Sequence, residues 1–248
     1  MSNFFSQRIA KIADDKKSRI VLALDPSPSR RDLCSFAEKT ISLVQQYICA
    51  IKMNFHIILP LSAFEISQIN ILAHSYGLQS IADIKLNDIE NTNEVVIEHL
   101  SKMGFDAVIA NPFVGMKGMQ SLVCKAHESK IGAIALVYMS HPGASEGFGL
   151  TIEEKDHQWP LYKIFFERAS KAGADGIVVG ATQLDILRQL AGHGLPVYSP
   201  GIGAQGGDVE NAVKGGADYV IVGRSIIEAE QPAKVAKELQ RRILAVGK

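Results

Sequence analysis

The chain has no net charge, few cysteines and no long apolar run. Among its 248 residues, 26 Lys and Arg balance 26 Asp and Glu, which argues against a nucleic-acid or membrane-surface binder held by bulk charge. The longest strongly apolar run, 131–139, is too short to span a bilayer. No linker rich in Pro, Gly or Ser divides the chain, so we expect residues 1–248 to form one domain.

Thiols and imidazoles are present, but not in metal-binding or disulfide patterns. Cys34, Cys49 and Cys124 are odd in number and have no C-x-x-C spacing, which favours a reducing cytoplasm over a disulfide framework. The seven histidines show no H-x-H or H-E-x-x-H spacing, so we expect no metal site. Residues 1–17 lack the apolar core of a secretory signal.

Short apolar runs recur along the whole chain. Most are rich in Val and Ile without polar alternation, which is typical of strands buried on both faces of a parallel sheet. The runs are 20–24, 48–51, 79–84, 106–110, 132–138, 175–179, 196–199 and 218–222. Helical segments separate them, so eight β-α units predict a closed (β/α)8 TIM barrel, with an open doubly wound sheet as the alternative.

The predicted helices have a repeated ending. Apolar positions at helical spacing predict helices over 69–76, 96–103 and about 226–243. The pattern K-x-G-x-D occurs at 102–106, 171–175 and 214–218, each time leading into an apolar run. Lys suits the last turn of a helix and Gly the residue after it, so we interpret these segments as structural helix-to-strand turns.

Charged residues follow the first three predicted strands. In a (β/α)8 barrel the site lies at the carboxyl ends of the strands, where this chain has Asp25, Lys52, Asp83, Lys85 and Asp88. Charges clustered in a barrel mouth are costly unless they pair or meet a ligand. A structural ion-pair network would explain any one of them, but five at one end of the barrel favour a site. Residues 83 and 85 are two apart, so both side chains should face the barrel interior.

The last two strand ends predict a phosphate site. Residues 200–207 are rich in glycine and precede a helical segment beginning near Asp208, while Gly223 and Arg224 open the final helix. Backbone N–H groups, a helix N-terminus and a guanidinium together bind phosphate well. A second glycine-rich segment, 140–149, follows the fifth strand in the longest gap, and we interpret it as an active-site lid.

These residues, in this order, resemble orotidine 5′-phosphate decarboxylase. The D-x-K-x-x-D motif stands at 83–88, between Leu-Ala-Leu-Asp25 and Ile-Lys52 before it and Met-Ser140-His-Pro-Gly after it. The segments 200–208 and 222–225 complete the pattern, so the resemblance spans about residues 19–227. It departs at 53–55, where Met-Asn-Phe replaces the glycine of many relatives.

The resemblance implies decarboxylation of orotidine 5′-phosphate to UMP, the last step of de novo pyrimidine synthesis, without metal or organic cofactor. It implies that Lys85 donates a proton to carbon 6, that Asp83 lies beside the substrate carboxylate and that Lys52 holds the charged array. The other implied substrate contacts are Asp25 to the ribose, Ser140 and Pro200 to the base, and Gln205, Gly223 and Arg224 to the phosphate. It also implies a homodimer in which Asp88, Ile89 and Thr92 reach the neighbouring subunit's site.

Two other functions remain as alternatives. Relatives that share the barrel and D-x-K-x-x-D act on sugar phosphates with magnesium, but they place an acidic metal ligand where this chain has Lys52, which would repel the ion. A non-catalytic phosphate or nucleotide binder would need the phosphate turns but not Lys85. Neither nucleic acid nor membrane is an expected partner.

Overall fold

Eight parallel strands close into a barrel in the computed structural model, which describes residues 4–154, 157–203 and 205–247. Their order around the barrel is β1-β10-β9-β8-β5-β4-β3-β2, which confirms the predicted closed barrel over an open sheet. The strands are β1 (Ile20–Leu24), β2 (Ala50–Asn54), β3 (Gln79–Leu86), β4 (Ala107–Ala110), β5 (Gly132–Tyr138), β8 (Gly176–Val179), β9 (Val197–Pro200) and β10 (Tyr219–Val222).

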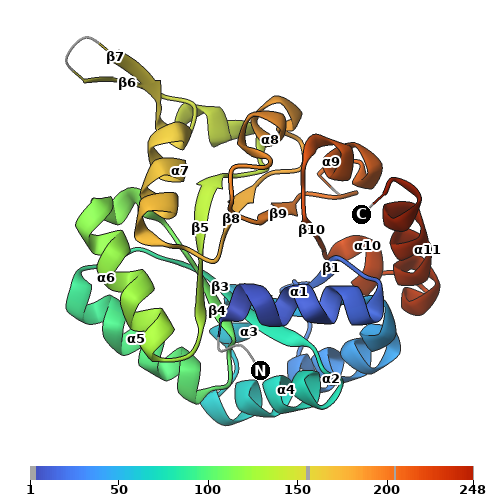
Figure 1. Ribbon diagram of the computed structural model, residues 1–248. Coiled ribbons are helices and arrows are strands. Elements are labelled where there is room, and N and C mark those ends of the chain that lie inside the picture. The colour runs from blue at the N-terminus through green and yellow to red at the C-terminus, as the bar shows by residue number, and fades with distance from the viewer. Residues whose placement is uncertain (1–3, 155–156, 204, 248) are drawn as a thin grey trace.

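A ring of helices surrounds the barrel (Figure 1). Its members are α2 (Leu33–Val44), α4 (Ala63–Ser75), α5 (Glu90–Lys102), α6 (Gly115–Glu128), α7 (Leu161–Ala172), α8 (Leu184–Leu190), α9 (Val209–Gly215) and α11 (Pro232–Ala245). Short helices α3 (Phe55–Ile58) and α10 (Arg224–Ile227) and the 3₁₀ turns Gln45–Tyr47, Pro112–Val114 and Pro142–Glu146 complete the connections. None of the described helices is both long and apolar enough to cross a bilayer.

Two strand ends and the last helix differ from the sequence prediction. β2 continues to Asn54, so Lys52 lies inside the strand, where two carboxylates compensate its charge. β3 likewise continues to Leu86 and contains both Asp83 and Lys85. The predicted helix 226–243 is two helices, α10 and α11, because the chain turns at 228–231 and Pro232 begins the second.

The long gap after β5 holds an unpredicted hairpin. The strands β6 (Thr151–Glu154) and β7 (His157–Pro160) pair antiparallel and project from the barrel beside α7 (Figure 1). The helix α7 begins directly after the hairpin, at Leu161. The segment 140–149, which precedes the hairpin, packs against the end of β5: the ring centroids of Phe148 and Tyr138 lie 5.7 Å apart.

An unpredicted N-terminal helix, α1 (Phe5–Lys16), closes the amino end of the barrel (Figure 1). Its buried face presents Phe5, Ile9 and Ala13 to the side chains inside the barrel. A Cβ on Gly132 would lie 2.7 Å from Phe5, so the first residue of β5 must be glycine for the helix to pack. The helix and the interior of the barrel therefore form one continuous apolar cluster.

The three K-x-G-x-D segments are helix-to-strand turns, as predicted. Gly104, Gly173 and Gly216 all have positive φ, which favours glycine. Each following aspartate accepts a hydrogen bond from a backbone N–H of the neighbouring strand: Asp106 from Ser80, Asp175 from Ala133 and Asp218 from Val197. The turns thus tie adjacent strands together at the amino end of the barrel, opposite the end that carries Asp25, Lys52 and Asp83.

Two of these aspartates also bind histidines, which makes stability depend on pH. A hydrogen bond to Asp106 raises the pKa of His74 above its ordinary 6.5, and one to Asp175 raises the pKa of His127. A histidine whose folded-state pKa is raised stabilises the fold fully below the unfolded pKa, and this contribution is lost as pH rises through the folded pKa. We therefore expect the stability advantage of the wild type over His74→Gln/His127→Gln to shrink above about pH 6.5.

Urea unfolding at a series of pH values measures this difference. The exposed His99, changed to Gln, is the control for loss of an imidazole from the surface. A wild-type advantage that stayed constant or grew with rising pH would contradict the assignment.

Candidate active site

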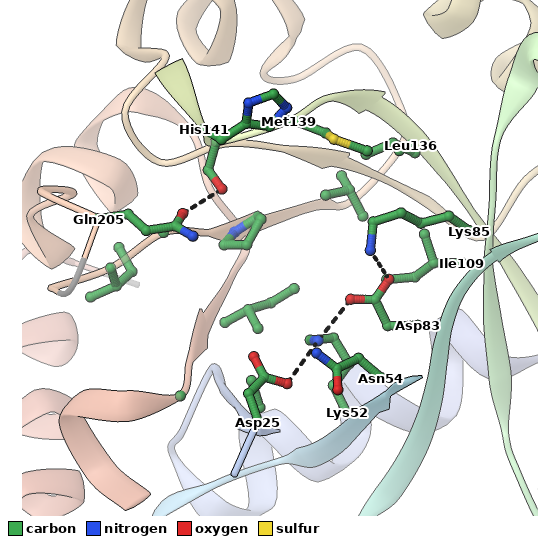
Figure 2. Close-up of a pocket in the computed structure, with 18 of the residues that line it drawn as sticks. Asp25, Lys52, Asn54, Asp83, Lys85, Ile109, Leu136, Met139, His141 and Gln205 are labelled. Atoms are coloured by element: carbon green, nitrogen blue, oxygen red, sulfur yellow. Dashed lines mark hydrogen bonds and ion pairs between the residues drawn. The ribbon is translucent and has the colours of Figure 1, made fainter. Parts of the chain in front are cut away.

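A cavity of about 280 Å³ opens at the carboxyl ends of the barrel strands (Figure 2). Its polar lining comes from the ends of β1, β2, β3, β5, β9 and β10 and the segments that follow them. The polar and glycine residues are Asp25, Lys52, Asn54, Asp83, Lys85, Ser140, His141, Gly201, Gln205, Gly223 and Arg224. The size is close to that of small-molecule sites, which fits one nucleotide-sized ligand.

Four charges of alternating sign form a chain across the cavity floor. Lys52 Nζ lies 2.7 Å from Asp83 Oδ2 and 3.7 Å from Asp25 Oδ1. Lys85 Nζ lies 2.8 Å from the other oxygen of Asp83. Figure 2 shows the order Asp25, Lys52, Asp83, Lys85 leading from one wall toward the other. The sequence prediction that charged side chains meet at one end of the barrel is confirmed for these four of the five residues.

Burial and neighbouring charge act in opposite directions on this array. Burial lowers the pKa of Lys52, but the nearby Asp83 and Asp25 more than reverse this and raise it. Burial raises the pKa of Asp83, but Lys52 and Lys85 overcome this and lower it. Both groups are therefore ionised at neutral pH. Because they are largely buried, solvent screens them little, and their electrostatic interactions with each other and with a ligand are strong.

The backbone of Lys85 is in the left-handed region. Its φ is +48°, and the pairing of β3 with β4 shifts register between Ala82 and Leu86. Such a conformation is uncommon for lysine and marks a bulge that aims the side chain. Simple alternation therefore predicted the right outcome, Asp83 and Lys85 on the same side, but the strand reaches it through a bulge.

The far wall of the cavity is built from glycine-rich backbone. Gly201 has φ +99°, and a Cβ there would lie 2.9 Å from both Gln205 Oε1 and Ser140 Cβ. Ser140 Oγ donates to Gln205 Oε1 at 2.6 Å and so joins the end of β5 to the loop after β9. Gly223 precedes α10, whose first residue is the exposed Arg224. Ala204 lies outside the described residues.

Three of the predicted site residues lie outside the cavity. Asp88 is exposed and its Oδ1 accepts from the backbone N–H of Ile89 at 2.7 Å. Ile89 is 72% exposed, and Thr92 lies in the first turn of α5. The other predicted residues, Asp25, Lys52, Asp83, Lys85, Ser140, Pro200, Gln205, Gly223 and Arg224, all line it.

The sequence patterns did not identify Asn54 or the apolar lining. Asn54 ends β2 two residues after Lys52, and its Oδ1 accepts from the N–H of His56 at 2.9 Å. Asn54 lies two residues after Lys52 on the same strand, and this spacing could have indicated that both side chains face the cavity. The apolar lining includes Ile109, Leu136, Val178 and Ile221, which belong to the cluster that continues down to α1. They occupy ordinary strand positions, so nothing in their local sequence distinguishes them.

The fold and the cavity define a (β/α)8-barrel enzyme with a charged site at the carboxyl ends of its strands. Residues 18–239 match the model of the "Orotidine 5'-phosphate decarboxylase / HUMPS family", and the chain belongs to this family.

Individual relatives agree along almost the full length. The orotidine 5′-phosphate decarboxylase of Methanosarcina barkeri is 35% identical over 93% of this chain and 97% of its own. That of Pyrococcus abyssi is 37% identical over 90% of this chain and 98% of its own. The crystal structure of orotidine 5′-monophosphate decarboxylase from Methanocaldococcus jannaschii, complexed with the inhibitor BMP, superposes with a TM-score of 0.77 at 30% identity. It covers 91% of this chain and 98% of its own.

Proposed function

We propose that this chain decarboxylates orotidine 5′-phosphate to UMP and carbon dioxide in pyrimidine biosynthesis. The family membership supports this function, and the observation that carries it is the alternating array of Asp25, Lys52, Asp83 and Lys85 in the cavity. The full chain would act as one domain, and the three free cysteines fit a reducing cytoplasm.

The chemistry requires charge rather than an electron sink. The bond between carbon 6 of the pyrimidine and its carboxylate breaks, carbon dioxide leaves, and the electron pair stays on carbon 6 in the plane of the ring. Because that orbital cannot delocalise into the ring, stabilisation must come from preorganised charge in a dry site. Lys85 is the ammonium placed to do this, and it then transfers a proton to carbon 6.

The other three charges hold and tune that ammonium. Asp83 accepts from Lys85 and Lys52 through different oxygens, so its position is fixed from two sides. The substrate carboxylate beside Asp83 makes a like-charge contact that disappears as carbon dioxide leaves. Asp25, at the other end of the array, would hold the ribose through a hydroxyl.

The opposite wall suits the phosphate and the base. Gln205, Gly223 and Arg224 would hold the phosphate, since a guanidinium and backbone N–H groups are its usual partners. Ser140 and Pro200 would contact the pyrimidine, and the bond from Ser140 to Gln205 links the two regions. Phosphate contacts distant from carbon 6 supply binding energy for positioning the reacting end.

Catalysis can be tested by following the loss of substrate absorbance with purified protein in EDTA. We expect turnover without added metal. If the chain were instead a magnesium-dependent enzyme, magnesium would restore activity on a sugar phosphate. The buried Lys52 ammonium disfavours a magnesium site. A non-catalytic binder would bind UMP and never turn over. Either result would refute the proposal.

The enzyme is also proposed to be a homodimer in which Asp88, Ile89 and Thr92 complete the neighbour's site. Exposed apolar side chains in the segments after the neighbouring strands β2 and β3 support an interface on this side of the barrel, since exposed apolar surface is typical of interaction sites. They are Leu59 at 74%, Phe64 at 71% and Ile89 at 72% exposed.

Ile89→Asp should dissociate the dimer. Ile89 is the N-cap residue of α5, where aspartate is favoured, so the isolated subunit should fold normally. Sedimentation should show half the wild-type mass, and turnover should fall with it. Leu244→Asp, at a half-exposed position on α11, is the control and should stay dimeric. A monomeric wild type, or an Ile89→Asp protein of unchanged mass, would contradict this.

A further inference from the structure

The outer helix α11 contacts the segment that ends the glycine-rich wall of the cavity. Arg242 Nε donates to Glu210 Oε1 at 2.6 Å, and its Nη2 donates to Asp208 Oδ2 at 3.0 Å and to Glu210 Oε2. The Arg242 side chain is 34% exposed, so these contacts are partly shielded from solvent. One guanidinium therefore fixes two carboxylates at the start of α9.

Asp208 is the point where the loop after β9 becomes helix. Its Oδ1 accepts from the N–H of Asn211 at 2.9 Å, while its Oδ2 is held by Arg242. The preceding loop is closed by two backbone bonds, from Gly203 N–H to the Gly207 carbonyl at 2.8 Å and from Gly207 N–H to the Gly201 carbonyl at 3.0 Å. The place of Asp208 thus sets the place of the loop that carries Gln205.

Charge gives Arg242 a second effect on the same loop. The hydrogen bonds from Arg242 lower the pKa of Glu210 to about 2, so this carboxylate is charged at neutral pH. Asp208 and Glu210 follow Gln205 within five residues along the chain, and Gln205 belongs to the wall assigned to a dianionic phosphate. Without the guanidinium, two carboxylates near a dianion would oppose its binding.

We infer that Arg242 is a positioning residue for the substrate phosphate: it anchors the loop through Asp208 and neutralises the carboxylates behind it. The inference rests on the function proposed above. Arg242 does not line the cavity, so it acts through the loop rather than by contact. Its effect should therefore appear only with ligands that carry the phosphate.

The helix itself should survive loss of the guanidinium. Ala236, Leu239 and Ile243 of α11 are buried against the barrel helices. Gln240 donates to the backbone carbonyls of Lys16 and Lys17 and ties α11 to the end of α1. We therefore expect Arg242→Gln to alter the loop after β9 and to leave α11 folded. An unchanged midpoint of thermal unfolding would verify that the fold is intact.

The test compares inhibition of turnover by UMP and by uridine in Arg242→Gln and wild type. We expect UMP to inhibit about tenfold more weakly in the variant, with uridine inhibition unchanged. KM for the substrate should rise by a similar factor, more at low salt than at high salt. Arg242→Lys keeps the charge but loses the planar fork, so its effect should be intermediate.

Arg241→Gln is the matched control. Arg241 is the next residue on the same helix, and it pairs with Glu238 through two bonds of 2.9 and 2.6 Å away from the loop. It changes the net charge equally and should leave UMP inhibition unchanged. Equal weakening of UMP and uridine, no weakening of UMP, or the same effect in both glutamine variants would overturn the inference. An inactive wild type would instead refute the proposed function.

Discussion

Lys85→Ala should reduce decarboxylation by about 10⁴-fold, because the variant lacks the group proposed as both the proton donor and the cation next to carbon 6. Asp83 would still pair with Lys52 at 2.7 Å, so the barrel should remain folded. UMP should still bind, since the residues assigned to its phosphate lie on the opposite wall. The measurement is single-turnover decarboxylation beside a binding titration with UMP.

Lys117→Ala, a surface lysine on α6, is the control for loss of one positive charge. It should turn over like wild type. A Lys85→Ala protein that kept more than about a tenth of wild-type turnover would refute the proton-donor role, since general acid catalysis contributes far more than that. Loss of UMP binding together with turnover would instead show that the variant had disturbed the whole site.

Lys52→Met should have the largest effect on stability. Lys52 is 4% exposed and lies between Asp83 and Asp25, whose Oδ1 is buried and has no hydrogen-bond partner among the described residues. Removing one partner from a buried charge cluster leaves the others uncompensated, which typically costs about 3–5 kcal/mol. Urea unfolding near neutral pH measures the loss, and turnover should disappear with it.

The pH dependence of this loss follows from the carboxylate. In the wild type the lysines lower the pKa of Asp83, so its ion pairs stabilise the fold above the ordinary value of 3.8 and are lost as pH falls below it. The difference between wild type and Lys52→Met should therefore be largest near neutrality and shrink in acid. Lys125→Met, which breaks the surface pair with Glu98, should change the unfolding midpoint little. A difference that grew in acid would be the opposite of this result.

Most of the barrel was predictable because its strands are buried on both faces. Short apolar runs, most of them rich in Val and Ile, identified all eight barrel strands, and the K-x-G-x-D turns marked the amino ends of β4, β8 and β10. β2 was placed too early because Lys52 does not look like a core residue. Its burial depends on Asp25 and Asp83, which are far away in the chain.

The remaining differences are tertiary in origin. α1 is only modestly apolar, and its three buried residues gain their partners from the barrel interior. The hairpin β6-β7 consists largely of polar residues and carries no strong strand signal. Most of the polar residues that line the cavity were predictable, because the order of the family motifs and the ends of the predicted strands point to the same residues. The contacts of Arg242 were not, since they join segments that are distant in the chain. Asn54 accepts from the N–H of His56, only two residues away, and belongs to none of the motifs recognised in the sequence.

The helix that closes the amino end covers the apolar interior of the barrel, and the proposed chemistry depends on keeping water out of that interior. From Phe5 and Ile9 the apolar cluster continues through Ile81 to Ile109, which lines the catalytic cavity. Water admitted under α1 would raise the effective dielectric constant around Lys85 and weaken the field that the proposed mechanism requires at carbon 6. The rate of turnover in the cavity is thus coupled to the packing of α1 at the opposite end of the barrel. An enzyme shortened by this helix would bind its nucleotide and yet turn over slowly.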